Sequence, residues 1–167
     1  PIFDACAEPF EFFKHYDSEA NTISIAYKYG EDEHQKLLAQ FQKAADEMLA
    51  TVTPDMSDVE KAKNIYHALC TRMAYDDSAL EDLERKDSYY AYLHNSGVCI
   101  TFANVYNQLL TQVGIKTTLA TCDYDATMGH AWSVVTLGGE DYFCDPTFEL
   151  PYDNGSGYVY FGMNYAD

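Results

Sequence analysis

The sequence predicts an α+β fold, in which helices come first and a small antiparallel sheet follows. Apolar residues repeat at helical spacing between residues 32 and 113, whereas residues 117–145 hold three short segments rich in β-branched and aromatic side chains. Separate runs of helices and strands are typical of α+β domains. The 167 residues, of which 47% are apolar, suffice for one domain with a core of its own.

The first third of the chain predicts one strand and one helix. Residues 1–20 are rich in aromatic side chains without a regular period, so we expect them to be irregular. Alternating apolar residues predict a strand over Thr22–Tyr29, and a helical stripe predicts a helix over Asp32–Leu49. We therefore expect residues 1–56 to form an N-terminal extension that packs on a core of residues 57–167, the two making one compact domain.

Two further helices are expected before the sheet. The segment S-D-V-E from Ser57 is a capping-box pattern, and the helix it begins should end near residues 74–76. Residues 77–96 are polar and tyrosine-rich, which favours a loop with a short helical turn. Helical spacing returns over residues 99–113, and Gly114 is well placed to end that helix.

Three strands are expected after that helix, over Thr117–Cys122, Ala131–Leu137 and Asp141–Asp145. The dipeptide Gly-Gly between the second and third predicts a hairpin. Cys122 and Cys144 fall on strands that we expect to be neighbours, where they form either a disulfide or two buried free thiols. The chain has 5 cysteines, so at least one thiol is free.

The charge balance excludes several classes of function. With 27 acidic and 10 basic residues, the net charge of −17 repels nucleic-acid phosphates, so no nucleic-acid partner is expected. No apolar run is long enough to span a membrane. No metal and no cofactor is expected, because the cysteines lack zinc-site spacing and the acidic cluster at residues 76–84 lacks the glycine turn of a calcium loop.

Three residues carry the candidate catalytic chemistry. Cys99 begins a predicted helix, where free N–H groups and the helix dipole stabilise a thiolate and an oxyanion. His130 directly precedes a strand, and Asp145 ends the next one, where its carboxylate can accept the Nδ1–H of His130. The segment between Cys99 and His130 is long enough for one helix and one strand, and the segment between His130 and Asp145 is long enough for one hairpin. The three side chains can therefore meet without long loops. Taken singly, each is equally well a buried cysteine, a surface histidine or a turn aspartate.

The flanking motifs resemble a known family. The segments Y-x-x-x-L-x-x-x-G-V-C, G-H-A-W-S-V-V and Y-F-C-D-P-T-F occur in this order, with S-D-V-E-K-A-K-N-I-Y-H-A-L and M-A-Y-D-D upstream. Together they resemble the bacterial members of the transglutaminase-like superfamily of papain-related thiol enzymes, over residues 57–150 and more loosely over 22–165. The resemblance implies a papain-like α+β fold, in which the helix carrying the nucleophile packs on the sheet. It also implies a catalytic triad of Cys99, His130 and Asp145.

The resemblance also points to residues around the triad. It implies an oxyanion donor at the backbone N–H of Cys99, and Tyr89, ten residues earlier, matches a family tyrosine and is the best candidate for a second donor. Asn95 is a weaker candidate. Trp132 shares a strand face with the histidine and can shield its imidazole and line the groove. Thr101 stands where bacterial relatives carry glycine, which alters the cleft floor or the substrate preference.

The implied chemistry is acyl transfer through a thioester on the cysteine. We predict a transglutaminase-like cysteine protease or amidase that hydrolyses peptide or amide bonds in a peptide or protein substrate. The alternatives are a protein-glutamine amine transferase, which cross-links proteins, and a non-catalytic binding module on the same fold. A trimmed start at Pro1 and the acidic surface suggest a secreted or cell-surface bacterial protein. The oligomeric state stays open.

Overall fold

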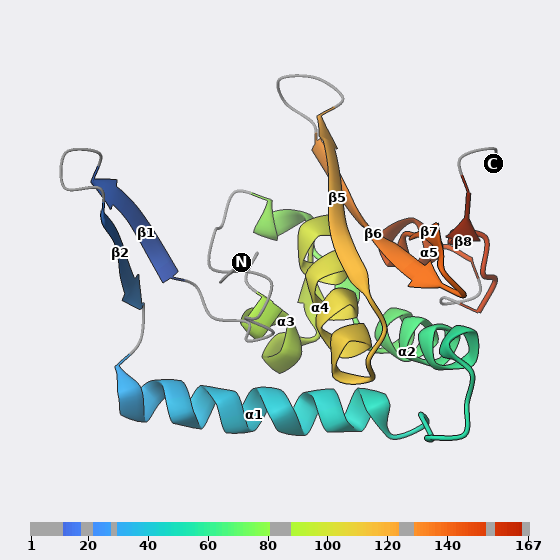
Figure 1. Ribbon diagram of the computed structural model, residues 1–167, viewed down its shortest axis with the longest axis horizontal. Helices are drawn as coiled ribbons and strands as arrows, with labels where there is room; N and C mark the ends of the chain where they lie inside the picture. Colours follow the sequence, from blue (N-terminus) through green and yellow to red (C-terminus); the bar gives the residue numbers. More distant parts are fainter. Residues whose placement is uncertain are drawn as a thin grey trace.

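The helices of the protein gather around α4, and a four-stranded sheet lies against that helix (Figure 1). The computed structural model describes residues 12–17, 22–27, 30–80, 88–123, 129–152 and 156–164. This arrangement confirms the predicted α+β class. The elements in chain order are β1 (Phe12–Asp17), β2 (Thr22–Tyr27), α1 (Glu31–Leu49), α2 (Asp58–Arg72), β3 (Ala74–Tyr75), the 3₁₀ helix η1 (Asp77–Ala79), α3 (Ser88–His94), β4 (Ser96–Gly97), α4 (Cys99–Gln112), β5 (Thr117–Asp123), β6 (Gly129–Leu137), β7 (Glu140–Cys144), α5 (Pro146–Glu149) and β8 (Phe161–Met163).

The N-terminal hairpin corrects the sequence prediction. β1 and β2 pair antiparallel, with Phe12 opposite Tyr27 and Asp17 opposite Thr22. We expected irregular chain before residue 22 because the run FFKHYD lacks alternation, but aromatic residues favour strands once a partner strand is present. The described extension thus holds two strands, while the expectations for residues 1–11, 18–21 and 28–29 lie outside the described residues.

The long helix α1 confirms the predicted helix and belongs to the core. Three acidic residues in its first turn complement the positive end of the helix dipole. Its apolar stripe includes Phe41, which meets Tyr92 of α3 edge-to-face at 4.4 Å between ring centroids. The helix packs on α2 and α3. The division of the chain at residues 56 and 57 stays a prediction.

The helices α2 and α4 form the centre of the core. The capping box at Ser57 is present, since its Oγ accepts the N–H of Glu60 at 3.3 Å and its own N–H donates to Glu60 Oε2 at 2.8 Å. On α4 the buried stripe faces α2 and β6, and Tyr106 donates its hydroxyl to the carbonyl of Ala62 at 3.0 Å. Both helices start and end within three residues of the predicted positions.

The chain between these helices is more ordered than we predicted. The sequence favoured a loop with one short turn over residues 77–96, whereas the structure shows η1, the seven-residue helix α3 and a parallel pairing of β3 with β4. The pairing sets Tyr75 opposite Gly97 and brings the end of α2 beside the start of α4. Such two-residue strands have no sequence signature, because the pairing depends on residues far apart in the chain.

The four-stranded sheet is antiparallel, in the order β5-β6-β7-β8. α4 covers one of its faces, where Ala131, Ser133 and Val135 are buried. The three strands predicted after residue 116 are confirmed, and β8 is an addition. The expectation that Cys122 and Cys144 lie on neighbouring strands was wrong, because β6 lies between β5 and β7, but of the two alternatives the free thiols are confirmed. Both thiols are free, and of the two only Cys144 is buried.

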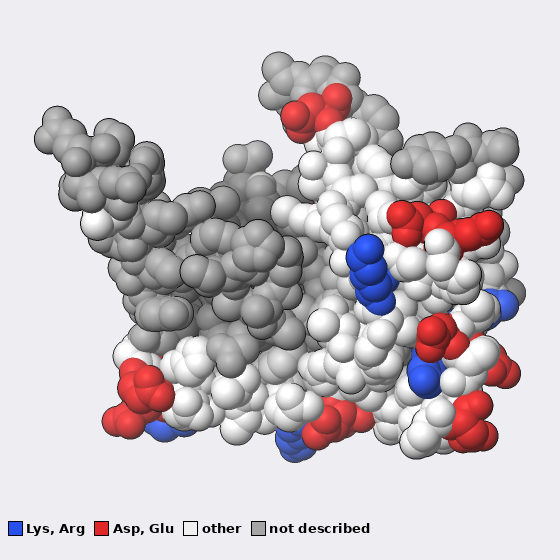
Figure 2. Space-filling view, viewed as in Figure 1, with Lys and Arg blue, Asp and Glu red and all other residues white. Residues whose placement is uncertain are grey.

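The surface follows the acidic composition. Figure 2 shows acidic side chains at several places on the described part of the visible face, with basic side chains beside some of them. Within the part of the chain that the structure describes, no helix is long and apolar enough to cross a membrane. Nor do the described side chains include a group of three or more His, Cys, Asp or Glu residues able to hold a metal ion.

Candidate active site

Cys99 lies at the first position of α4, as the sequence predicted. The extended residue Val98 precedes it, and the thiol is half-buried. The preceding glycine is required here, because a Cβ on Gly97 would lie 2.7 Å from Cβ of Thr101. The close approach of β4 to the first turn of α4 therefore fixes where the helix begins. As a result the sulfur sits where unpaired backbone N–H groups of a helix start can stabilise negative charge.

His130 is the second residue of β6 and faces Cys99 and Asp145. Its Nε2 lies 2.5 Å from Oδ2 of Asp145. We had predicted that Nδ1 would donate to the carboxylate, and that assignment of the ring nitrogens was wrong. With Nε2 engaged, Nδ1 is the nitrogen left to meet the Cys99 thiol, with which the imidazole forms a hydrogen bond. The strand also begins earlier than predicted, so His130 lies within it.

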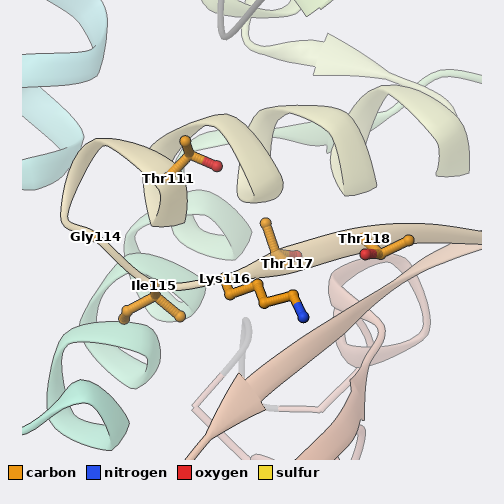
Figure 3. Close-up of a pocket in the computed structure, with 6 residues that line it drawn as sticks. All are labelled: Thr111, Gly114, Ile115, Lys116, Thr117 and Thr118. Atoms are coloured by element: carbon orange, nitrogen blue, oxygen red, sulfur yellow. The ribbon is translucent and has the colours of Figure 1, made fainter. Parts of the chain in front are cut away.

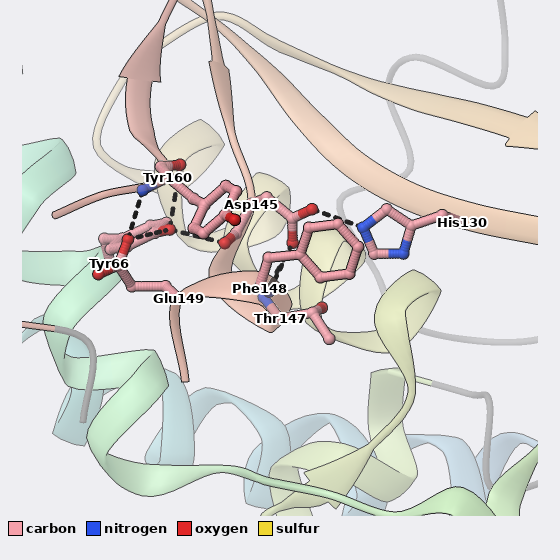
Figure 4. Close-up of polar contacts among 7 residues, drawn as sticks. All are labelled: Tyr66, His130, Asp145, Thr147, Phe148, Glu149 and Tyr160. Carbon is pink, nitrogen blue, oxygen red and sulfur yellow. Dashed lines mark hydrogen bonds and ion pairs between the residues drawn. The ribbon is translucent and has the colours of Figure 1, made fainter. Parts of the chain in front are cut away.

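Asp145 is held by both its backbone and its side chain. It follows β7 and caps α5, with Oδ1 accepting the N–H groups of Thr147 and Phe148 at 3.0 Å each. Its own N–H donates to the carbonyl of Tyr160 at 2.9 Å. The residue is 4% exposed. One carboxylate oxygen is therefore used to place the residue, and the other is aimed at His130 (Figure 4).

The electrostatics of the pair favour charge separation. Burial opposes ionisation of Cys99, yet the hydrogen bond from His130, the N–H of Ala131, the charge of His130 and the N–H of Ile100 together lower the pKa of the thiol. For His130, burial again acts against the charged form. Its hydrogen bonds to Asp145 and Cys99 and their negative charges outweigh burial and raise the pKa of the imidazole to about 9. Both shifts act in the direction of a thiolate beside an imidazolium.

Two aromatic rings stack with the imidazole of His130. Phe148 stacks on His130 at 4.2 Å between centroids with an interplanar angle of 13°, and Trp132 stacks at 5.9 Å and 27°. The groove role of Trp132 stays a prediction. Sequence reasoning missed Phe148, although it is the last residue of the motif Y-F-C-D-P-T-F. A cavity of about 230 Å³ opens beside these rings and is lined by His130, Trp132, Phe143, Asp145, Phe148, Tyr160 and Met163.

The other predicted residues of the site have different surroundings. Thr101 is fully buried, and its Oγ1 accepts the N–H of Val98 at 3.4 Å, so it supports the helix start and does not line a groove. Asn95 accepts from Nε of Arg72 at 2.6 Å, which gives its side chain a structural partner away from the triad. The side chain of Tyr89 lies outside the described residues, so its role as an oxyanion donor stays a prediction.

Tyr75 is a further neighbour of the thiol that the sequence analysis did not single out as a site residue. It sits on β3 opposite Gly97, with 38% of its surface exposed, and its ring stacks on Phe102 at 6.5 Å. Burial, and then the negative charges of Cys99 and Asp77, raise the pKa of its hydroxyl. This side chain therefore lies close enough to the thiol for the two groups to influence each other's ionisation. Its signal in the sequence was the motif M-A-Y-D-D.

Replacing Gly97 by alanine is expected to destabilise the protein and to displace Cys99. The new methyl group would meet the β-branched Thr101 next to the backbone of α4, and overpacking of this kind costs about 1–3 kcal/mol. Thermal unfolding and the rate of Cys99 alkylation measure the two effects. Gly30→Ala is the matched control, because a Cβ there meets nothing within 4 Å. Equal melting temperatures and alkylation rates for both variants would contradict the proposed fit.

A larger concavity of about 550 Å³ lies elsewhere, where α4 passes into β5 (Figure 3). Its lining comprises Thr111, Gly114, Ile115, Lys116, Thr117 and Thr118. None of these is a candidate catalytic residue, and the lining holds no cysteine, histidine or carboxylate. The smaller cavity beside His130 is the one lined by two of the candidate catalytic residues, His130 and Asp145.

Comparison with known proteins agrees with this fold. The family model of the transglutaminase-like superfamily matches residues 42–147, more than half of the chain. The structure is similar to that of a TGase, with a TM-score of 0.58 and 14% identity over 72% of this chain and 34% of that one. It is also similar to a candidate cysteine protease from Cytophaga hutchinsonii, with a TM-score of 0.52 and 15% identity over 87% of this chain and 64% of the other.

The chain thus spans about a third of the first of these structures and less than two thirds of the second. No curated protein matches it. The family match includes Cys99, His130 and Asp145 within its bounds, together with α2, α4 and three strands of the sheet. By its sequence and its fold, the chain belongs to the transglutaminase-like superfamily.

Proposed function

We propose that this protein is a thiol-dependent acyl-transfer enzyme that hydrolyses peptide or amide bonds. The observation that carries the proposal is the chain of contacts from the thiol of Cys99 through the imidazole of His130 to the carboxylate of Asp145. Nucleophile, base and orienting residue come from three different elements, a helix start and the ends of two strands. A nucleophile paired with an oriented base is the arrangement that thiol enzymes use.

The reaction follows from the protonation states of the pair. The Cys99 thiolate attacks the amide carbonyl and forms a tetrahedral oxyanion, which the backbone N–H of Cys99 at the start of α4 is placed to stabilise. His130 gives its Nδ1 proton to the leaving amine, the C–N bond breaks, and a thioester remains on the sulfur. The neutral imidazole then takes a proton from water, whose oxygen attacks the thioester. The acid is released and the thiolate–imidazolium pair is restored.

The cavity beside His130 supports a peptide substrate with an uncharged side chain on the leaving-group side. Because His130 protonates the leaving amine, the residue that carries this amine lies next to the imidazole. The cavity there is lined mainly by apolar side chains, among them Trp132, Phe143 and Met163. A positively charged imidazolium at its edge disfavours a basic side chain. An apolar or aromatic residue after the scissile bond fits this lining.

Transfer of the acyl group to a protein amine is the second candidate. It shares every step as far as the thioester and differs only in the acceptor. The names of the two similar structures represent both reactions, one a TGase and the other a candidate cysteine protease. Hydrolysis stays our first candidate, and the experiment below decides between the two acceptors. The acidic surface supports an extracytoplasmic site of action and argues against a nucleic-acid partner.

A peptide library separates these functions. Mass spectrometry of the library after incubation, with and without added methylamine, identifies the products. Hydrolysis predicts cleaved peptides, or glutamines converted to glutamates, whose yield methylamine does not change. Transfer predicts methylamide products that displace them. If a correctly folded protein gives no product with or without methylamine, the proposal that it is an enzyme is contradicted. A non-catalytic binding module is then favoured.

A further inference from the structure

A second group of buried polar side chains lies behind Asp145, on the side away from His130 (Figure 4). Tyr66 of α2 and Glu149 at the end of α5 are both 0% exposed. The proposed reaction uses neither of them. Buried polar groups are retained where their hydrogen bonds fix a particular arrangement, so their partners indicate what they hold in place.

The hydroxyl of Tyr66 connects α2 to the residue that orients the base. Its oxygen lies 2.7 Å from the carbonyl oxygen of Asp145, 3.1 Å from that of Tyr160 and 3.3 Å from Oε2 of Glu149. Burial, and then the negative charges around it, raise the pKa of this hydroxyl far above its usual value, so it stays protonated and donates. Asp145 offers the shortest of the three distances.

Glu149 fixes the segment that pairs with Asp145. Its Oε2 accepts the N–H of Tyr160 at 2.7 Å, and its Oε1 accepts the N–H of Val159 at 3.2 Å. The carbonyl of the same Tyr160 then accepts the N–H of Asp145 at 2.9 Å. The backbone of Asp145 is thereby held at its carbonyl by Tyr66 and at its N–H by a segment that Glu149 anchors.

We propose that Tyr66 is a positioning residue for the reaction, which fixes the backbone of Asp145 so that its carboxylate keeps the imidazole of His130 aligned with Cys99. The inference rests on the proposed function, because it concerns the same triad. Tyr66 touches neither His130 nor a reacting atom, and it acts through Asp145. Glu149 serves the same end through Tyr160.

The test compares Tyr66→Phe with Tyr106→Phe. Both tyrosines are fully buried, lie edge-to-face at 5.4 Å and donate to a backbone carbonyl. The carbonyl that Tyr106 meets belongs to Ala62, and its hydroxyl also contacts the thiol of Cys144, so it lies close to the triad without holding the backbone of Asp145. Each variant loses one buried hydroxyl, so both should lower the melting temperature. The informative readout is the rate at which iodoacetamide alkylates Cys99 as a function of pH, which requires no substrate.

In Tyr66→Phe we expect the pKa of Cys99 to rise by about one unit, because a less firmly held carboxylate stabilises the imidazolium less. Alkylation at pH 6.5 then falls about tenfold, since one pKa unit is a factor of ten. With a peptide substrate we expect kcat to fall by a similar factor and KM to stay unchanged. Tyr106→Phe should keep the wild-type pH profile.

Three outcomes overturn the inference in different ways. If both variants keep the wild-type alkylation profile, Tyr66 has only a structural role. If both shift it equally, the effect is general loosening of the core. If the wild-type protein itself shows no lowered pKa at Cys99, the proposed function fails and the inference fails with it. If Tyr66→Phe does not fold, Glu149→Gln replaces it, because this change releases the segment of Tyr160. We expect Glu149→Gln to shift the pH profile of Cys99 alkylation in the same direction. An unshifted profile in Glu149→Gln would count against the inference.

Discussion

Replacing Cys99 by alanine is expected to lower turnover by about 10⁴-fold or more, since removal of an enzymatic nucleophile has effects of this order. In the wild type the sulfur forms the covalent bond to the acyl group, and no group at the start of α4 can replace it. The thiol is half-buried, so its loss should change the melting temperature little. Turnover of a peptide found in the library and thermal unfolding by circular dichroism measure the two effects.

The matched control is Cys122→Ser, because Cys122 is also a half-buried free thiol and lies on β5 directly opposite His130, so it is close to the base without beginning α4. We expect it to retain full turnover. If Cys99→Ala kept more than about a tenth of wild-type activity, Cys99 would not be the nucleophile. If Cys122→Ser lost its activity as well, Cys122 would be the better candidate.

Replacing Asp145 by asparagine is expected to lower turnover by about 10²–10³-fold, below the 10⁴-fold loss known for the same change in a serine enzyme. The carboxylate uses one oxygen to cap α5 and the other to accept from Nε2 of His130, whereas an amide has a single oxygen. If that oxygen caps the helix, the amide N–H₂ faces Nε2 and forces the proton onto Nδ1. The imidazole then cannot accept the thiol proton of Cys99.

The dependence of kcat/KM on pH in Asp145→Asn tests the role of the carboxylate more specifically than the loss of turnover does. The hydrogen bond to Asp145 is the largest of the influences that raise the pKa of His130 to about 9. In Asp145→Asn the pKa should fall towards about 6.5, the ordinary value. The alkaline limb of kcat/KM should therefore move to lower pH. Asp141→Asn is the control, because Asp141 is an exposed residue of β7 that accepts from Thr136 at 2.7 Å. An unchanged alkaline limb in Asp145→Asn would show that Asp145 does not act on the histidine.

Local signals explain which parts of the fold the sequence could predict. The capping box at Ser57 places the start of α2, and the Gly138–Gly139 turn joins β6 to β7 because both glycines adopt positive φ. The position of Cys99 at a helix start follows from the helical repeat that begins there. In each case the residues that determine the structure are within a few positions of it in the chain.

The features that the sequence did not predict depend on contacts between distant segments. Strand β8 pairs with β7 but is only three residues long, and β6 separates two cysteine strands that look adjacent in sequence. The contact of Tyr66 with Asp145 joins residues 79 positions apart. The ring nitrogen that meets Asp145 depends on how β6 and β7 present the two side chains. A pattern of residue types contains none of this geometry, so the triad could be named while its orientation could not.

The central claim is that Cys99 and His130 form a thiolate–imidazolium pair, and alkylation of the wild-type protein across the pH range tests it most directly. A thiol in the unfolded chain ionises near pH 8.5. Because the folded pKa of Cys99 is lowered, its alkylation should rise at lower pH than that of the unfolded chain. The buried thiols of Cys70 and Cys144, both with raised pKa values, should react slowly throughout. Turnover should fall as the pH passes about 9, where His130 loses its proton.

Peptide mapping by mass spectrometry assigns the label to each cysteine in a single experiment. At pH 6.5 we expect Cys99 to be alkylated much faster in the folded protein than in the urea-unfolded chain. Alkylation of Cys99 that rises only near pH 8.5, at the rate of the unfolded chain, would contradict the central claim.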